Sequence, residues 1–125
     1  PLFYHYGEDK DFVNRLHYHQ YQVGYSPQVF GNHDREYRPS THEGFLRTES
    51  VYHLSEYVNI NHPWLKAFGY GVLAVMKKAL ISLISGKFQL SKDYLRMGFQ
   101  LLSRSTEIQS YRKINRLSQP HYIQK

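Results

Sequence analysis

The stretch WLKAFGYGVLAVMKKALISLIS, from Trp64 to Ser85, decides the fold, because it is the only long apolar run in a chain of 125 residues. As a helix, about 22 residues measure about 33 Å, which is long enough to cross the hydrocarbon of a bilayer. Pro63 suits the first turn of such a helix, and Gly86 suits its C-terminal cap. We therefore expect one apolar helix over residues 63–86.

A helical wheel divides this stretch into a broad apolar side and a narrow side of small and cationic residues. The broad side holds Leu65, Phe68, Val72, Leu73, Val75, Met76, Ala79, Leu80 and Leu83. The narrow side holds Lys66, Ala67, Gly71, Ala74, Lys77, Lys78, Ser82 and Ser85. Because small residues let helices approach closely, we expect another helix to pack at Gly71 and Ala74. The predicted membrane or partner contacts are Trp64, Leu65, Phe68, Gly71, Val72, Ala74, Val75, Met76, Leu80 and Leu83.

Three interpretations of this helix remain open. As a lone transmembrane span it is poor, since Lys77 and Lys78 near its middle would each cost about 2.5 to 3.5 kcal/mol. An embedded or interfacial helix becomes acceptable if the small and cationic side packs on a larger complex, or if the lysines reach a polar boundary. The third interpretation is a long core helix of a soluble protein with its lysines in water. We favour the second interpretation.

The charge of the chain changes abruptly just before the apolar run. Up to His62 there are 5 basic and 8 acidic residues, whereas from Pro63 onward there are 11 basic and 2 acidic residues. This shift predicts three regions: an acidic region rich in His and Tyr over 1–62, the apolar helix over 63–86, and a basic tail over 87–125. The positive-inside rule would place the basic tail on the negatively charged side of a membrane and the first region on the other side.

The rest of the sequence favours helices. Asp9 or Asp11 can cap a first short helix, and Ser40 with Glu43 has the spacing of a capping box for one or two more. Turn-forming residues over 24–39 predict an extended connection. A helical stripe restarts at Ser91 and runs on, or bends near residues 103–106. Strand patterns are weak, so we predict a mainly α fold: an extended N-terminal region with short helices, one long apolar helix and a basic amphipathic C-terminal helix.

No residue pattern in this chain points to catalysis. Cysteine is absent, which excludes disulfides and thiolate chemistry. Phosphate-binding glycine loops, a nucleophile elbow and a zinc-binding helix motif are also absent from the sequence. His17 and His19 would point about 200° apart on a helix, so they do not suggest a shared metal. We expect no enzyme, no catalytic or metal-binding residue, no cofactor and no small-molecule substrate. The first ten residues match neither a signal peptide nor a transit peptide, so we expect any import signal to be removed or internal.

The basic tail carries cations on an amphipathic helix. We predict that six cations contact anionic lipid or a protein partner: Lys77, Lys78, Arg104, Arg112, Lys113 and Arg116. Tyr111 stands among the tail cations, so the same segment could instead bind RNA phosphates and stack on bases.

The whole layout resembles the small supernumerary subunits of mitochondrial respiratory-chain complexes. The likeness rests on the acidic region rich in His and Tyr, the apolar helix interrupted by lysines and the basic helical tail. It implies a noncatalytic subunit that braces a large hetero-oligomeric complex of the inner membrane, with the first half toward the intermembrane space and the tail toward the matrix. Phe68, Val72, Met76 and Leu83 would then face lipid or a neighbouring subunit. The alternatives are a small basic protein of a ribosome or other RNA assembly, and a Tyr-rich structural protein of a filament that makes its contacts through residues 21–39.

Overall fold

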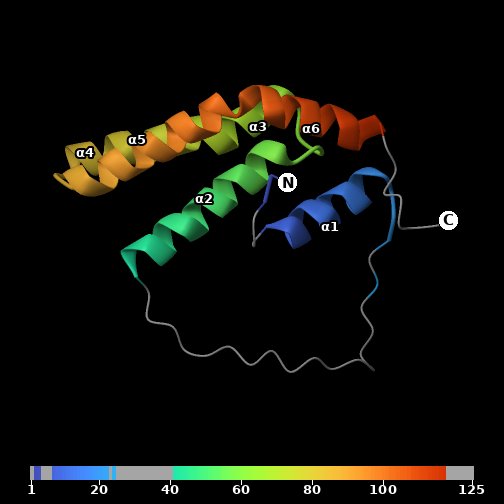
Figure 1. Cartoon of the computed structure of the whole chain (residues 1–125), viewed down its shortest axis with the longest axis horizontal. Coiled ribbons are helices and arrows are strands. Elements are labelled where there is room, and N and C mark those ends of the chain that lie inside the picture. Colours follow the sequence, from blue (N-terminus) through green and yellow to red (C-terminus); the bar gives the residue numbers. More distant parts are fainter. Residues whose placement is uncertain (1, 4–6, 23, 25–40, 118–125) are drawn as a thin grey trace.

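The computed structural model describes residues 2–3, 7–22, 24 and 41–117, and every regular element among them is a helix (Figure 1). The mainly α fold predicted from the sequence is therefore confirmed. The elements are α1 (Glu8–Tyr18), α2 (His42–Val58), α3 (Trp64–Phe68), the π-helical turn η1 (Gly69–Leu73), α4 (Ala74–Ile84), α5 (Phe88–Ser103) and α6 (Ser105–Leu117). The predicted extended connection over 24–39 lies almost entirely outside the described residues.

The elements α3, η1 and α4 form one continuous helix, Trp64–Ile84, which is long and apolar enough to cross a membrane. The boundary residues are those expected from the sequence. Pro63 precedes the first turn, and Gly86 follows the last turn with a φ of +70°. That left-handed conformation suits glycine, and it reverses the chain into α5.

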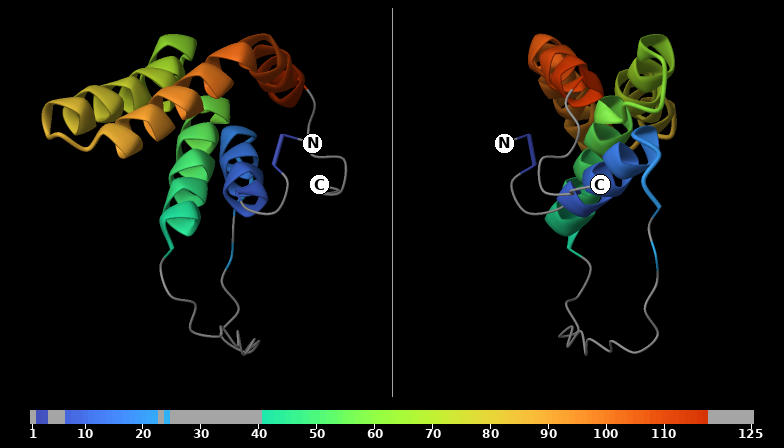
Figure 2. Two further views of the ribbon diagram at one scale, coloured as in Figure 1. Left: turned by 60° about the vertical axis from the view of Figure 1, so that its left-hand side comes forward. Right: turned by 90° about the vertical axis from the view of Figure 1, so that its right-hand side faces the viewer.

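Helices α4 and α5 form an antiparallel hairpin, and they lie side by side in Figures 1 and 2. The Ser91 hydroxyl of α5 donates a hydrogen bond of 2.8 Å to the Ala79 carbonyl of α4. Helix α5 begins at Phe88, three residues before the predicted start at Ser91, and ends at Ser103. The chain then bends into α6, as one of the two sequence predictions had it.

Helix α2 lies against one side of the hairpin, and α1 lies beside α2 (Figure 2). Helix α2 is a single helix of 17 residues. Its N-cap is Thr41, whose side chain accepts a hydrogen bond of 3.0 Å from the Gly44 amide. The predicted N-cap, Ser40 of a capping box with Glu43, was therefore one residue too early. For α1 the N-cap is Gly7, so the predicted cap residues Asp9 and Asp11 stand in its first turn instead.

The hydrophobic core forms where α2 meets the other helices. Its central members are residues with at most 1% exposure, because they point from each helix into this shared interior. They are Tyr57, Val58, Ala67, Val72, Val75, Ala79 and Ile108. The core thus takes Ala67 from the small side of the apolar helix and Val72, Val75 and Ala79 from its large apolar side. Leu65, Leu73, Leu80 and Leu83 of the large apolar side stay exposed.

Candidate membrane-docking surface on the α4–α5 hairpin

Gly71, on the small side of the apolar helix, packs against α2 of the same chain. A Cβ atom added at Gly71 would lie 2.5 Å from Tyr57 Cβ and 3.3 Å from the His53 carbonyl oxygen, so only glycine allows this approach. The sequence predicted that Gly71 lies at a close helix contact, and this is confirmed. The partner helix, however, belongs to this chain, whereas the sequence interpretation placed it in a larger complex.

The predicted membrane or partner residues fall into three groups. Leu65, Leu80 and Leu83 are exposed, and Trp64, Phe68, Ala74 and Met76 are half-buried, while Gly71, Val72 and Val75 are buried. Val72 is 1% exposed, so the expectation that it faces lipid or a neighbouring subunit was wrong. The wheel placed it on the apolar side, but that part of the side lies in the core of the protein. Val75 is 0% exposed, so the expectation that it contacts a membrane or partner was wrong too.

Large apolar side chains remain exposed on both helices of the hairpin. Ile81 (52% exposed) and Leu83 (48%) of α4 are exposed, and two further sets of three stand out. The apolar helix carries Leu73 (56%) of η1 with Leu80 (57%) and Ile84 (78%) of α4, and α5 carries Phe88 (69%), Leu95 (41%) and Phe99 (62%). In each helix the three residues stand at positions i, i+7 and i+11, which lie close to one line along a helix. We call these six residues the outer face.

The outer face lies on the side of the hairpin opposite to α2. On α4, Lys78 contacts Glu49 of α2, and on α5, Met97 lines a groove with Ser50 and Leu54 of α2. Leu80 and Phe99 each follow one of these α2-facing residues by two positions. Residues two positions apart in a helix point about 160° away from each other. Both apolar lines therefore point away from α2 and form one surface.

The charges around the outer face are cationic. Lys77 and Lys92 are exposed and stand four residues after Leu73 and Phe88, the first apolar residue of each line. The only acidic residue between positions 64 and 103 is Asp93. Its carboxylate accepts a hydrogen bond of 3.0 Å from His42 Nε2 of α2, which holds the pKa of Asp93 below its ordinary value. The outer face thus combines apolar side chains with positive charge.

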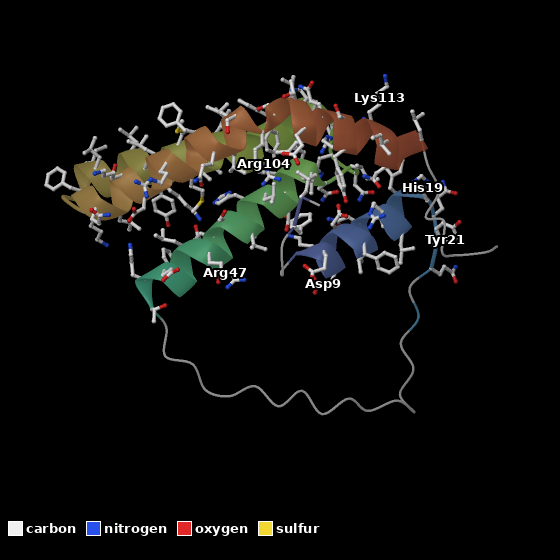
Figure 3. All side chains as sticks on the ribbon, viewed as in Figure 1. Asp9, His19, Tyr21, Arg47, Arg104 and Lys113 are labelled. Atoms are coloured by element: carbon white, nitrogen blue, oxygen red, sulfur yellow. The ribbon has the colours of Figure 1, made fainter. Side chains whose placement is uncertain are left out.

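The six predicted contact cations have different environments. Lys78 forms an ion pair with Glu49, and Arg104 pairs with Glu107 at 2.9 Å. Lys77 and Lys113 are exposed, and Lys113 points away from the helices in Figure 3. These positions leave Lys77 and Lys113 best placed to meet another molecule.

Arg112 and Arg116 bind the end of α2. Arg112 is 4% exposed, and it donates to the carbonyls of Tyr57 (3.1 Å) and His62 (2.6 Å). Arg116 donates to the carbonyls of Ile60 (3.0 Å) and His62 (2.9 Å). Burial, followed by the charge of Arg116, lowers the pKa of Arg112 to about 10. The expectation that Arg112 contacts lipid or a partner was wrong, because its guanidinium satisfies carbonyls at a helix C-terminus inside the protein.

A buried polar cluster joins α2 to the apolar helix. The His53 ring donates from Nδ1 to the Tyr70 carbonyl at 2.9 Å, and its Nε2 lies 3.8 Å from Glu49 Oε2. Burial is the main cause that lowers the pKa of His53, so the ring is held neutral. The same Glu49 oxygen meets Lys78 and accepts a hydrogen bond from the Tyr94 hydroxyl at 3.4 Å. The Tyr70 carbonyl and Lys78 of the apolar helix thus bind polar side chains of α2.

Sequence reasoning missed most of the outer face. Of its six residues, only Leu80 was among the predicted contacts. Phe88, Leu95 and Phe99 carry the same spacing as the line on α4, which was the available signal. Its meaning depends on the antiparallel pairing of α4 with α5.

Comparison with known proteins adds no identification. No family model, no curated protein and no solved structure matches this chain. Within the described residues, no group of three or more His, Asp or Glu side chains is arranged to hold a metal ion. The surface that stands out is the outer face of the hairpin.

Proposed function

We propose that this chain is a noncatalytic, membrane-associated accessory subunit, attached to a bilayer through the outer face of its α4–α5 hairpin. One observation carries the proposal: a helix long enough to cross a membrane packs closely against α2 at Gly71 and leaves one side, with Leu73, Leu80 and Ile84, uncovered. Only 33% of its most apolar stretch of 18 residues is buried within the chain. A core helix of a soluble protein would have this side covered.

The size of the exposed surface supports a lipid partner. Single exposed apolar residues are normal, but contiguous apolar patches of several large side chains mark interaction sites. Ile84, at 78% exposure, would still gain about 1 to 2 kcal/mol on transfer from water, since full burial of such a side chain contributes about 1.5 to 3 kcal/mol. The other five residues of the outer face are 41% to 69% exposed and would each add a smaller gain on the same surface.

The location we propose is the mitochondrial inner membrane, in a respiratory-chain complex. Support for this finer assignment comes from the layout of the chain: an acidic first region, the apolar helix and a basic tail. Carbonate extraction and native electrophoresis of detergent-solubilised mitochondria would test it. Co-migration with a large inner-membrane complex is expected, and a migration as a small particle would contradict it.

The RNA-binding alternative is weakened by the tail. Arg112 and Arg116, which would have met phosphates, donate to carbonyls of the α2 end instead. The filament alternative depends on residues 21–39, most of which lie outside the described part of the chain, and it stays a prediction.

Flotation with vesicles tests the membrane assignment. Wild-type protein is expected to float in a sucrose gradient with vesicles of phosphatidylcholine and phosphatidylglycerol. The double variant Leu80→Asp/Phe99→Asp is expected to stay at the bottom, because charge on the outer face opposes insertion. Phe45→Asp is the matched control, since Phe45 is 45% exposed on α2, away from the outer face. Wild-type protein that stays at the bottom of the gradient would overturn the proposal.

A further inference from the structure

We infer that the hairpin lies flat on one leaflet of an anionic membrane, with the outer face toward the acyl chains and without crossing the bilayer. This inference rests on the proposed function, and it specifies the lipid class and the geometry of the same surface.

Helix α5 is the first reason against a crossing. It runs antiparallel along α4 and is hydrogen-bonded to it through Ser91. A crossing α4 would carry α5 with it, and α5 presents exposed Lys92 and Arg96 together with the half-buried Asp93. Charges inside the hydrocarbon of a bilayer are strongly unfavourable.

Helix α2 is the second reason. It packs at Gly71, and its Glu49 forms an ion pair with Lys78, near the middle of the span. The α2 helix also carries exposed Glu43 and Arg47. A bilayer centred on the apolar helix would have to accommodate these polar residues, whereas a leaflet beneath the outer face would not touch them.

The distribution of apolar residues favours a flat hairpin over insertion by its tip. Each line of the outer face extends over eleven residue steps, or about 16 Å of helix, so the apolar surface runs along the hairpin. At the tip, the exposed residues Ser85, Gly86 and Lys87 separate the exposed Ile84 from the exposed Phe88. Flat docking places all six side chains at one depth.

The cations near the outer face indicate which class of lipid it binds. Lys77 and Lys92 stand within the two apolar lines, and lysine stems can lie along an apolar surface while their ammonium groups reach the headgroups. Between residues 64 and 103 there are 6 basic residues and 1 acidic residue, and that acid, Asp93, is bound on the α2 side. A surface of this composition fits anionic headgroups better than neutral ones.

Depth measurements on labelled protein test the geometry. The chain has no cysteine, so single substitutions Leu73→Cys, Ile84→Cys and Phe99→Cys each give one site for an environment-sensitive fluorophore. Phe45→Cys supplies a control on α2. Quenching by lipids brominated at different depths then reports the position of each label in phosphatidylcholine–phosphatidylglycerol vesicles.

The expected result is equal depth for labels 73, 84 and 99, near the boundary of headgroups and acyl chains, with label 45 in water. A spanning helix would place label 73 near the bilayer centre and label 84 at an interface. The orientation predicted from the positive-inside rule, with the basic tail on the negatively charged side of the membrane, would then apply. Tip-first insertion would place label 84 deepest. Either pattern would overturn flat docking and leave the proposed membrane association standing, whereas labels that never enter lipid would overturn both.

The charge argument has its own variant. Lys77→Glu/Lys92→Glu is expected to weaken binding to the anionic vesicles by tenfold or more, with little effect on vesicles of phosphatidylcholine alone. Equal binding of wild type to both vesicle types would overturn the assignment to anionic lipid. Labels 73, 84 and 99 that are already shielded in a lipid-free dimer, and stay so with vesicles, would show that a second copy covers the outer face.

Discussion

The close contact at Gly71 makes a sharp prediction about stability. A methyl group at this position would lie 2.5 Å from Tyr57 Cβ and 2.8 Å from Tyr57 Cγ, about 1 Å inside ordinary van der Waals contact. Tyr57 is fully buried, and its Cβ is bound to the backbone of α2, so a side-chain rotation cannot relieve the overlap. Gly71→Ala therefore requires α2 and the apolar helix to separate.

The magnitude follows from two opposing effects. Replacing glycine by alanine within a helix stabilises it by about 0.5 to 1 kcal/mol. Overpacking a core commonly costs about 1 to 3 kcal/mol, and here the upper end applies because backbone must move. We expect Gly71→Ala to lower the free energy of unfolding by about 2 kcal/mol, measured by urea unfolding followed by circular dichroism.

Two other glycines provide matched controls. An added Cβ at Gly69 meets nothing within 4 Å, so Gly69→Ala should be as stable as wild type or more stable. At Gly98 the nearest atom is Met76 Sδ at 2.9 Å, on a flexible side chain that can move, so Gly98→Ala should cost little. Equal stability of Gly71→Ala and Gly69→Ala would refute the reasoning and the helix contact on which it rests.

Two further changes probe the interior. Arg112→Met should reduce the free energy of unfolding by about 3 kcal/mol, because it leaves buried carbonyls without donors, whereas Lys113→Ala at the exposed neighbour should change it by less than about 0.5 kcal/mol in the same urea assay. The lowered pKa of His53 means that the unfolded chain, with a pKa near 6.5, binds a proton more readily than the folded chain. Stability should therefore fall as pH drops from about 6.5 toward the lower folded pKa, and urea midpoints at several pH values should show a smaller fall for His53→Gln. Glu49 and Lys78 also face this ring, so Glu49→Gln is a necessary comparison.

The helices and the ends of the apolar helix could be predicted from the sequence because the signals are local. A long apolar run, a proline before it and a glycine after it act through backbone geometry and the chain's own neighbours. The bend between α5 and α6 was one of two alternatives that the sequence left open. The predicted N-cap residues were less accurate. The helices α1 and α2 begin after Gly7 and Thr41, and not after the acidic or hydroxyl residues nearby that the sequence had suggested.

The candidate site could be predicted only in part. Leu80 and Lys77 were among the predicted contacts, and both are exposed. Arg112 was misplaced, because its sequence context is that of a cation on the polar side of an amphipathic helix. Its burial depends on the end of α2, which lies more than fifty positions away along the chain.

By itself, the sequence determined that this chain is helical, that one helix is apolar over the length of a bilayer, and that this helix has a small side and a large side. Those properties follow from residue size, polarity and the helical period. Only the tertiary structure decided which residues of each side are covered. Close packing of α2 at Gly71 uses the small side, and pairing with α5 brings a second apolar line next to the first, so the uncovered surface belongs to two helices and not to one.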